Sequence, residues 1–359
     1  MRTACMSFFG VREATRVIIN GSEIAGLDSL AHPPPSEPTT MKQFSSLLLA
    51  ASAAVGCANT SGNTNQACAA LTQASANPAP AWTGSVFTIV MENKSRGDIV
   101  GNKSAPFINK LISEGALVAG YHDSFVHPSE PNYIWMAAGQ NFGILDDSDP
   151  IKHSIDSSSH IADQLELAGL TWKSYQESMG APCGLTSHGR YAAKHNPFVY
   201  FDDINGWDGK TFQPSPRCNE HVVDYSQLDA DIAANALPRY AFITPNLDND
   251  MHDGSVAQGD AWLANEIPKI MATDAYKNGG VIFLLWDEGS GTFGPGDDPP
   301  FIVISPNANV GMTSKVSYDT TSYLKTVQQI LGVEPVPCAP DPTAVKAMTD
   351  VFSVPLTRG

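Results

Sequence analysis

From residue 85 onward, short apolar runs alternate with segments of helical periodicity, and no other feature of the chain constrains its fold as strongly. The runs have the length of strands and lie at residues 85–91, 116–121, 170–175, 239–245, 280–286 and 300–305. Helical patterns lie between most of them, at residues 105–114, 132–138, 160–168, 260–272 and 320–331. Strands that alternate with helices favour a parallel sheet covered on both faces. We therefore expect an α/β fold with a mostly parallel central sheet flanked by helices.

Polar side chains follow three of these expected strands. Glu92 and Asn93 follow the first strand, the segment "LDNDMHD" (247–253) follows the fourth, and Asp287 and Glu288 follow the fifth. Parallel strands end at one edge of a sheet, and ligands bind at that edge in open α/β folds. Several carboxylates brought together repel one another unless positive charge lies among them. The three strand ends therefore predict a divalent metal site.

The ligand types limit which metal is expected. Carboxylate and amide oxygens suit Ca²⁺, Mg²⁺ or Mn²⁺, whereas His252 would extend the choice to Zn²⁺ or Fe. The alternative is that these are ordinary turn residues, since Asp and Asn are common after strands and an acidic pair is more often solvated. Three clusters at three strand ends make the metal site the better interpretation.

The segment "HPSEPNY" (127–133) introduces the expected helix at residues 132–138. Proline is well placed in a first helical turn, so Ser129 is expected to be the N-cap, and it could be nothing more than that. A helix N-terminus also binds phosphate, and a serine beside a metal is a candidate nucleophile. Asn132, one turn later, could donate a hydrogen bond to a phosphoryl oxygen.

The net charge of the chain is −16, and Lys and Arg form no run. Such a charge repels nucleic acid and anionic membranes, so neither is an expected partner. An anionic substrate would need local positive charge or a metal ion to overcome this field.

The first 81 residues differ from the rest of the chain. Residues 41–57 have a positive start, an apolar core and small residues, which is the pattern of a secretory signal and too short for a membrane span. Residues 1–40 are interpreted as a non-native upstream extension and 58–81 as a flexible linker. The residues before Cys57 also resemble a bacterial lipobox, with Ala in place of the usual Leu. We expect an exported protein that is secreted, periplasmic or lipid-anchored.

The cysteine pattern gives one further expectation. Cys183 and Cys218 flank a loop-rich stretch, and in an exported protein they could form a disulfide. There is no CxxC spacing, which argues against a zinc–cysteine metal centre. Their pairing would belong to the fold and not to the catalysis.

Seven segments together resemble the bacterial and fungal phosphoesterase family, which includes secreted acid phosphatases and is related to bacterial phospholipases C. They are "MEN" (91–93), "APFINKL" (105–111), "HPSEPNY" (127–133), "KHNPFVYF" (194–201), "PNLDNDMHDGS" (245–255), "GDAWL" (259–263) and "WDEG" (286–289). They run in a consistent order over roughly residues 84–335, within an expected catalytic domain of residues 82–359. The resemblance implies the fold of the alkaline phosphatase superfamily.

The resemblance also implies roles for individual residues. Ser129 matches the nucleophile, which forms a phospho-enzyme and contacts the metal. The expected metal ligands that match the family pattern are Glu92, Asn93, Asp287 and Glu288. Asp248 and His252 are similar to an Asp-x-x-x-His metal pair of wider relatives, although Thr320 stands where many phosphoesterases have a further histidine. One metal is therefore expected, with His252 near the phosphate.

Three weaker assignments concern the protonation of the leaving group. His127 could be a general acid or a partner of the metal ligands, and Lys194 and His195 could meet substrate oxygens or protonate the leaving group. Their alternative is that they are ordinary loop residues. The expected function is a metal-dependent phosphomonoesterase of the acid phosphatase type. The alternatives are a phosphodiesterase or phospholipase C on the same site, or a surface protein that only binds phosphorylated ligands.

Overall fold

The computed structural model describes residues 82–291, 298–336 and 344–357. The predicted upstream extension (1–40), signal peptide (41–57) and linker (58–81) lie outside the described residues. No helix within the described ranges is long and apolar enough to cross a membrane.

An eight-stranded sheet organises the described part of the chain, in the order β4-β3-β5-β1-β6-β7-β2-β8. The strands are β1 Val86–Met91, β2 Ala116–Val118, β3 Trp172–Gln176, β4 Val222–Asp224, β5 Tyr240–Thr244, β6 Val281–Trp286, β7 Phe301–Ile304 and β8 Met312–Ser314. Only the pairings of β7 with β6 and with β2 are antiparallel, and the other pairings are parallel. The predicted mostly parallel sheet is confirmed.

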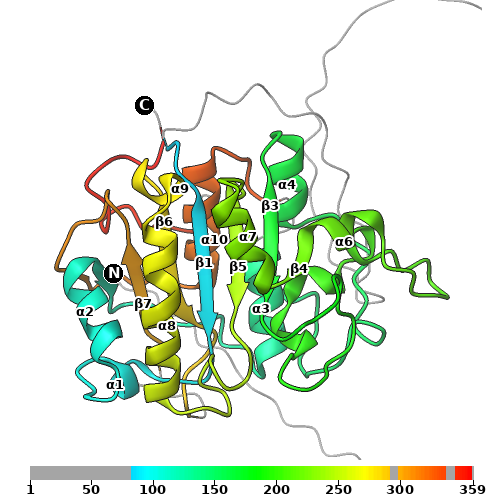
Figure 1. Ribbon diagram of the computed structural model, residues 1–359, viewed down its shortest axis with the longest axis horizontal. Helices are drawn as coiled ribbons and strands as arrows, with labels where there is room; N and C mark the ends of the chain where they lie inside the picture. The colour runs from blue at the N-terminus through cyan, green and yellow to red at the C-terminus, as the bar shows by residue number, and fades with distance from the viewer. Residues whose placement is uncertain (1–81, 292–297, 337–343, 358–359) are drawn as a thin grey trace, which may run out of the picture. The chain divides into compact units, whose positions relative to one another are not determined.

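Helices cover both faces of this sheet (Figure 1). The α-helices are α1 Arg96–Ile99, α2 Pro106–Glu114, α3 Ser129–Ala138, α4 Ile161–Leu167, α5 Asp202–Asn205, α6 Pro216–His221, α7 Ser226–Ala233, α8 Val256–Met271, α9 Asp274–Lys277 and α10 Thr320–Leu331. Two short 3₁₀ turns, η1 Ala193–His195 and η2 Pro197–Tyr200, lie in the long segment between β3 and β4.

The alternation of side chains along the central strands explains the two layers of helices. On β1, Val86 and Val90 join the core that contains α3, α4 and α10, whereas Phe87, Ile89 and Met91 join the core that contains α2, α7 and α8. Successive side chains of a strand point to opposite faces. A strand that is apolar at nearly every position, as β1 is, must therefore be covered on both sides.

The sequence predictions agree with most element boundaries. The helix at residues 320–331 is found as predicted, and α8 begins a turn earlier than predicted, at Val256, because Ser255 accepts a hydrogen bond from the backbone N–H of Gln258. The strands β4 and β8 were not predicted, because their short segments lack a continuous apolar run.

The strand order places the three predicted polar clusters together. The strand β1 lies between β5 and β6 and is parallel to both. The chain segments that follow these three strands therefore leave the sheet at the same edge. Glu92 follows β1 and Asp287 follows β6, and the backbone N–H of Glu92 donates to the carbonyl of Asp250, which lies beyond β5 (2.8 Å).

Candidate active site

The helix α3 begins at Ser129, which lies beside the end of β1. Its hydroxyl is almost completely buried, with 1% of the residue exposed, and donates a hydrogen bond to Oε2 of Glu92 (3.1 Å). The expectation that Ser129 caps this helix is wrong: Pro128 occupies the cap position and Ser129 is the first helical residue. The hydroxyl is thus directed at a carboxylate and not at the helix backbone. Tyr133 donates to the other oxygen of Glu92 (2.5 Å).

The end of β6 supplies two more acidic groups. Asp287 is fully buried, and its Oδ1 accepts a hydrogen bond from the backbone N–H of Asn93 (3.1 Å). Asn93 has a positive φ of 50°, a conformation that Asn tolerates better than most residues. Glu288 accepts from Nδ2 of Asn132 (3.1 Å) and lies 3.0 Å from Nδ1 of His127. These contacts join the end of β6 to the end of β1 and to α3.

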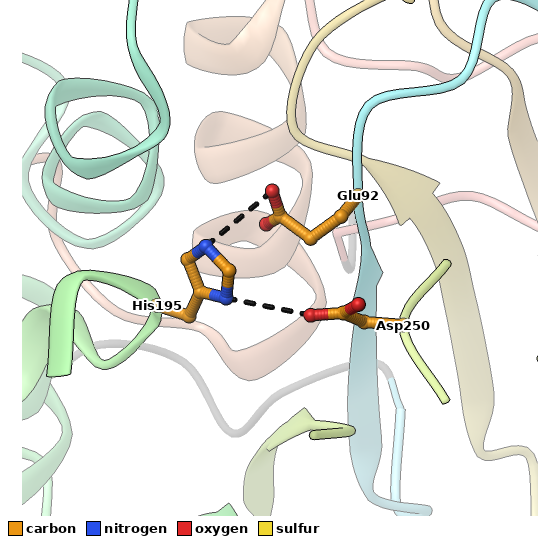
Figure 2. Close-up of side chains that lie close together, drawn as sticks. All are labelled: Glu92, His195 and Asp250. Carbon is orange, nitrogen blue, oxygen red and sulfur yellow. Dashed lines mark ion pairs between the residues drawn. The ribbon is translucent and has the colours of Figure 1, made fainter. Parts of the chain in front are cut away.

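His195 lies between two carboxylates, as Figure 2 shows. Its Nε2 is 3.4 Å from Oε2 of Glu92, and its Nδ1 is 3.4 Å from Oδ2 of Asp250. All three residues are buried, and Tyr133 stacks on the imidazole with ring centroids 5.0 Å apart. Potential ligand atoms of Glu92, His195 and Asp250 lie within 4.8 Å of one another, so the group could hold a metal ion.

Burial shapes the electrostatics of this group. It raises the pKa of Asp287 to about 6 and that of Asp250 to about 7. Burial and then the charge of Asp287 raise the pKa of Glu288 to about 9. Burial, followed by the charges of Asp287 and Asp250, raises the pKa of Glu92 well above its ordinary value. Burial lowers the pKa of His195 well below its usual range, so its imidazole is neutral.

Several buried polar atoms of the same residues have no hydrogen-bond partner among the described residues: Nε2 of His195, Oδ2 of Asp250, Oδ2 of Asp287 and Oδ1 of Asn132. The approaches of His195 to Glu92 and Asp250 are close, but they are too long or too poorly aligned to satisfy these atoms. Unpaired buried acceptors are costly. Carboxylate oxygens and a neutral imidazole nitrogen are metal-ligand atoms, so these residues fit a divalent cation.

The predicted residues are only partly brought together. Ser129, Glu92 and Asp287 meet at the edge of the sheet, and His195 joins them. Glu288 lies one contact further out, and Asn93 contributes its backbone N–H.

Asn132 differs from its expected role. Its amide group donates to the carbonyl of Val126 (2.6 Å) and to Glu288, so both amide hydrogens already have an acceptor in the protein. Asn132 thus holds Glu288 and the loop before α3.

The structure does not bring Asp248 into this group. Its carboxylate forms a two-pronged ion pair with the guanidinium of Arg190. Asp250, two residues later, takes the place beside His195, and sequence reasoning did not single it out. Both aspartates belong to the same segment after β5, so the sequence indicated the segment but not which aspartate would lie beside His195. His252 is half-buried, with its ring centroid 5.8 Å from that of His195 and its Nδ1 2.8 Å from Asp253.

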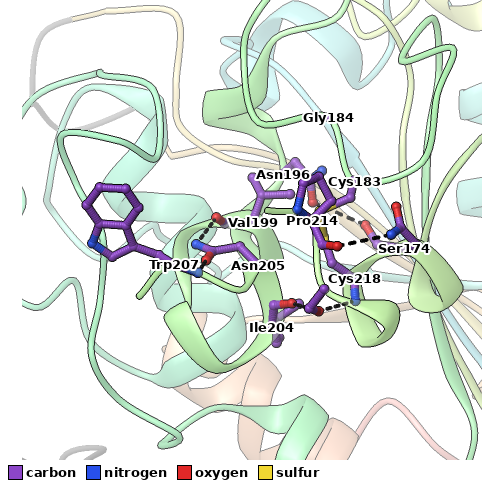
Figure 3. Close-up of a disulfide and its surroundings, with 12 residues drawn as sticks. Ser174, Cys183, Gly184, Asn196, Val199, Ile204, Asn205, Trp207, Pro214 and Cys218 are labelled. Carbon is purple, nitrogen blue, oxygen red and sulfur yellow. Dashed lines mark hydrogen bonds between the residues drawn. A yellow bond between two sulfur atoms is a disulfide. The ribbon is translucent and has the colours of Figure 1, made fainter. Parts of the chain in front are cut away.

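A disulfide supports the turn that carries His195 (Figure 3). Cys183 and Cys218 are bonded, which confirms their predicted pairing. The carbonyl of Gly184 accepts from the hydroxyl of Tyr191 (2.6 Å), and the same hydroxyl accepts from Nδ2 of Asn196 (3.0 Å). The disulfide is thus linked, through two hydrogen bonds, to the residue that follows His195.

A serine hydroxyl on a buried carboxylate, within a group that fits a metal ion, is an arrangement suited to phosphoryl transfer. The family model described as "Phosphoesterase family" matches residues 99–334. The chain belongs to the phosphoesterase family. This membership confirms the predicted family and the prediction of an enzyme that hydrolyses phosphate esters.

Two curated relatives and one solved structure place this phosphoesterase among known proteins. A Mycobacterium tuberculosis protein named phosphatidylinositol-3-phosphatase is 34% identical over 69% of this chain and 77% of its own length. An Aspergillus fumigatus acid phosphatase is 30% identical over 58% of this chain, which spans 45% of the fungal protein. A Vibrio parahaemolyticus protein of the alkaline phosphatase superfamily has a TM-score of 0.52 at 13% identity, covering 77% of this chain and 74% of its own. This likeness confirms the predicted fold.

Proposed function

We propose that this phosphoesterase is an exported, metal-dependent phosphomonoesterase of the acid phosphatase type, with Ser129 as its nucleophile. The observation that carries the proposal is the hydrogen bond from the buried hydroxyl of Ser129 to Glu92, at the first residue of α3. The neighbours of this carboxylate include unpaired buried acceptors, which fits a site that binds a ligand. The names of the two relatives, a phosphoinositide phosphatase and an acid phosphatase, fit a phosphorylated small-molecule or lipid substrate.

Four residues would hold the metal ion: Glu92, His195 and Asp250, with Asp287 beside them. When bound, a divalent ion supplies positive charge that stabilises the charge developing on the phosphoryl oxygens. A donor set of carboxylates with one imidazole suits Mn²⁺, Zn²⁺ or Fe better than Ca²⁺ or Mg²⁺, which prefer oxygen ligands alone.

The chain's own residues suggest the order of events. As Oγ of Ser129 forms its bond to phosphorus, the bond from phosphorus to the substrate alcohol breaks, and the hydroxyl proton passes to Glu92, its present acceptor. His252 lies beside His195 with Nδ1 held by Asp253, and it is the proposed donor of a proton to the departing alcohol. Water then attacks the phosphoserine and passes a proton to His252, while the departing oxygen of Ser129 takes back the proton from Glu92, so phosphate is released and the starting state is restored.

The disulfide supports the export part of the proposal. Disulfides persist in oxidising compartments and are rare in the cytosol. The bond between Cys183 and Cys218 is therefore consistent with the predicted signal peptide at residues 41–57.

The test compares hydrolysis of p-nitrophenyl phosphate with that of its bis-ester, with and without a chelator. Monoester cleavage that is lost on chelation and restored by metal supports the proposal. A phosphate adduct on Ser129, trapped by acid quench and located by mass spectrometry, tests the nucleophile directly. A preference for the bis-ester would favour a diesterase, and Ser129→Ala with full activity would exclude the nucleophile.

A further inference from the structure

Lys194 is held at the N-terminal end of α3 by a bridging carboxylate. Oδ2 of Asp147 lies 2.8 Å from Nζ of Lys194, and Oδ1 of the same carboxylate accepts from the backbone N–H of Glu130 (3.1 Å). Glu130 directly follows Ser129, and Lys194 directly precedes His195. One carboxylate therefore joins the cation to the first turn of the helix that carries the proposed nucleophile.

The loop that carries Asp147 is itself fixed to α3. The side chain of Glu130 is buried, its Oε2 accepts from the backbone N–H of Ser148 (2.6 Å), and its Oε1 lies 2.6 Å from Nδ1 of His153. These contacts hold the part of the loop that follows Asp147. The Lys194 ammonium group is thus held in place by Asp147, whose loop is packed against α3.

Two other cations near the site, Arg190 and Lys94, each have two partners in the protein. Arg190 binds the carboxylates of Asp248 and Asp253. Lys94 donates to the backbone carbonyls of Asn93 (3.1 Å) and Met251 (2.8 Å). These two side chains therefore have few donors left for a ligand.

The ammonium group of Lys194 differs from these, because it has one carboxylate as its partner and three hydrogens to donate. Its side chain is 22% exposed, so solvent reaches part of it.

We propose that Lys194 binds a non-bridging oxygen of the substrate phosphate and gives the enzyme its preference for dianionic monoesters over monoanionic diesters, while Asp147 positions it. The inference rests on the proposed function, because it concerns the same site. A phosphate beside Ser129 would be bound by this ammonium group at the N-terminal end of α3. Removing one positive charge weakens the attraction for a dianion about twice as much as for a monoanion.

The experiment measures kcat/KM for p-nitrophenyl phosphate and for its bis-ester, together with the binding of inorganic phosphate to the metal-loaded protein by calorimetry. The variants are K194M, K194R and the matched control K173M. Lys173 also pairs with one aspartate, Asp231 (2.6 Å), and its side chain is 23% exposed, but it lies on β3 with its partner on α7. We expect K194M to lower monoester kcat/KM and phosphate affinity roughly 10- to 100-fold, as for the loss of a charged hydrogen bond.

The outcomes separate this inference from the proposed function. In K194M the bis-ester activity should fall much less than the monoester activity, K194R should keep most of the preference, and K173M should keep both activities. Equal losses on the two esters, or unchanged phosphate binding, would overturn the role of Lys194 while wild-type monoester hydrolysis and the phosphoserine adduct still stand. If K194M does not fold, as judged by circular dichroism, the same comparison is made with K194Q.

Discussion

If the site holds a divalent ion, as we propose, its removal should destabilise the fold more at pH 8 than at pH 5. The reason is the set of buried carboxylates whose pKa values are raised in the ion-free protein, among them Asp287 and Asp250. Between the ordinary pKa of a carboxyl group and its raised value, the folded protein binds more protons than the unfolded chain. Its stability therefore falls as the pH rises through this window, from about pH 4 to about pH 7.

The structure gives the scale of the effect. The pKa of Asp287 rises from 3.8 to about 6. One pKa unit corresponds to about 1.4 kcal/mol, so the raised pKa of this single group lowers the stability of the ion-free fold by roughly 3 kcal/mol at pH 8. At pH 8 a bound cation removes that cost, because it stabilises the ionised carboxylate. At pH 5 protons compete with the cation for the carboxylate. For a domain of this size, roughly 3 kcal/mol corresponds to about 6 °C in Tm, and Asp250 adds to it.

The assay is thermal unfolding of the metal-loaded and the chelated protein at both pH values, followed by circular dichroism. The gain in Tm from the metal should be larger at pH 8 by about 6 °C or more. Asp287→Asn should shrink this difference, whereas Asp231→Asn, which removes a carboxylate paired with Lys173 outside the site, should leave it unchanged. A metal-induced gain that is equal at the two pH values, or larger at pH 5, would refute the reasoning.

Three further predictions concern single residues of the site and the disulfide. Ser129→Ala should lower kcat roughly a thousandfold or more while Tm stays within a few degrees, which p-nitrophenyl phosphate kinetics and melting curves will check. Asp287→Asn should reduce the metal content that survives dialysis, measured by mass spectrometry of the metal, and unchanged content would exclude it as a ligand. Replacing Cys183 and Cys218 by serine should lower the free energy of unfolding by about 2–5 kcal/mol in urea titrations, with the metal still bound.

The sheet was predictable because its central strands are apolar at nearly every position. The strands β1 and β6 are buried along their whole length, and the same residues produce the signal in the sequence and the core in the structure. The strand β8 gives no such signal, since it has three residues and is partly exposed. Its pairing with β2 comes from the fold around it.

The site residues that directly follow strands could be predicted from the sequence. Those whose positions depend on the conformation of a loop could not. Glu92 and Asp287 follow β1 and β6, so the sheet alone places them. Which aspartate after β5 faces His195 depends on a turn in which Asn246 accepts from two backbone N–H groups and Met251 has a φ of 79°. No periodicity encodes such a turn, and therefore Asp248 was singled out instead of Asp250.

The position of β1 at the centre of the sheet has a consequence for how the protein is made. Its two neighbours, β5 and β6, begin at Tyr240 and Val281, in the last third of the chain. During synthesis from the N-terminus, the apolar segment Val86–Met91 therefore has no partner strand until most of the polypeptide has been made. Aggregation is the main hazard at this stage. The same delay keeps Glu92 away from Asp250 and Asp287. Hydrolytic activity therefore begins only when most of the chain has been made.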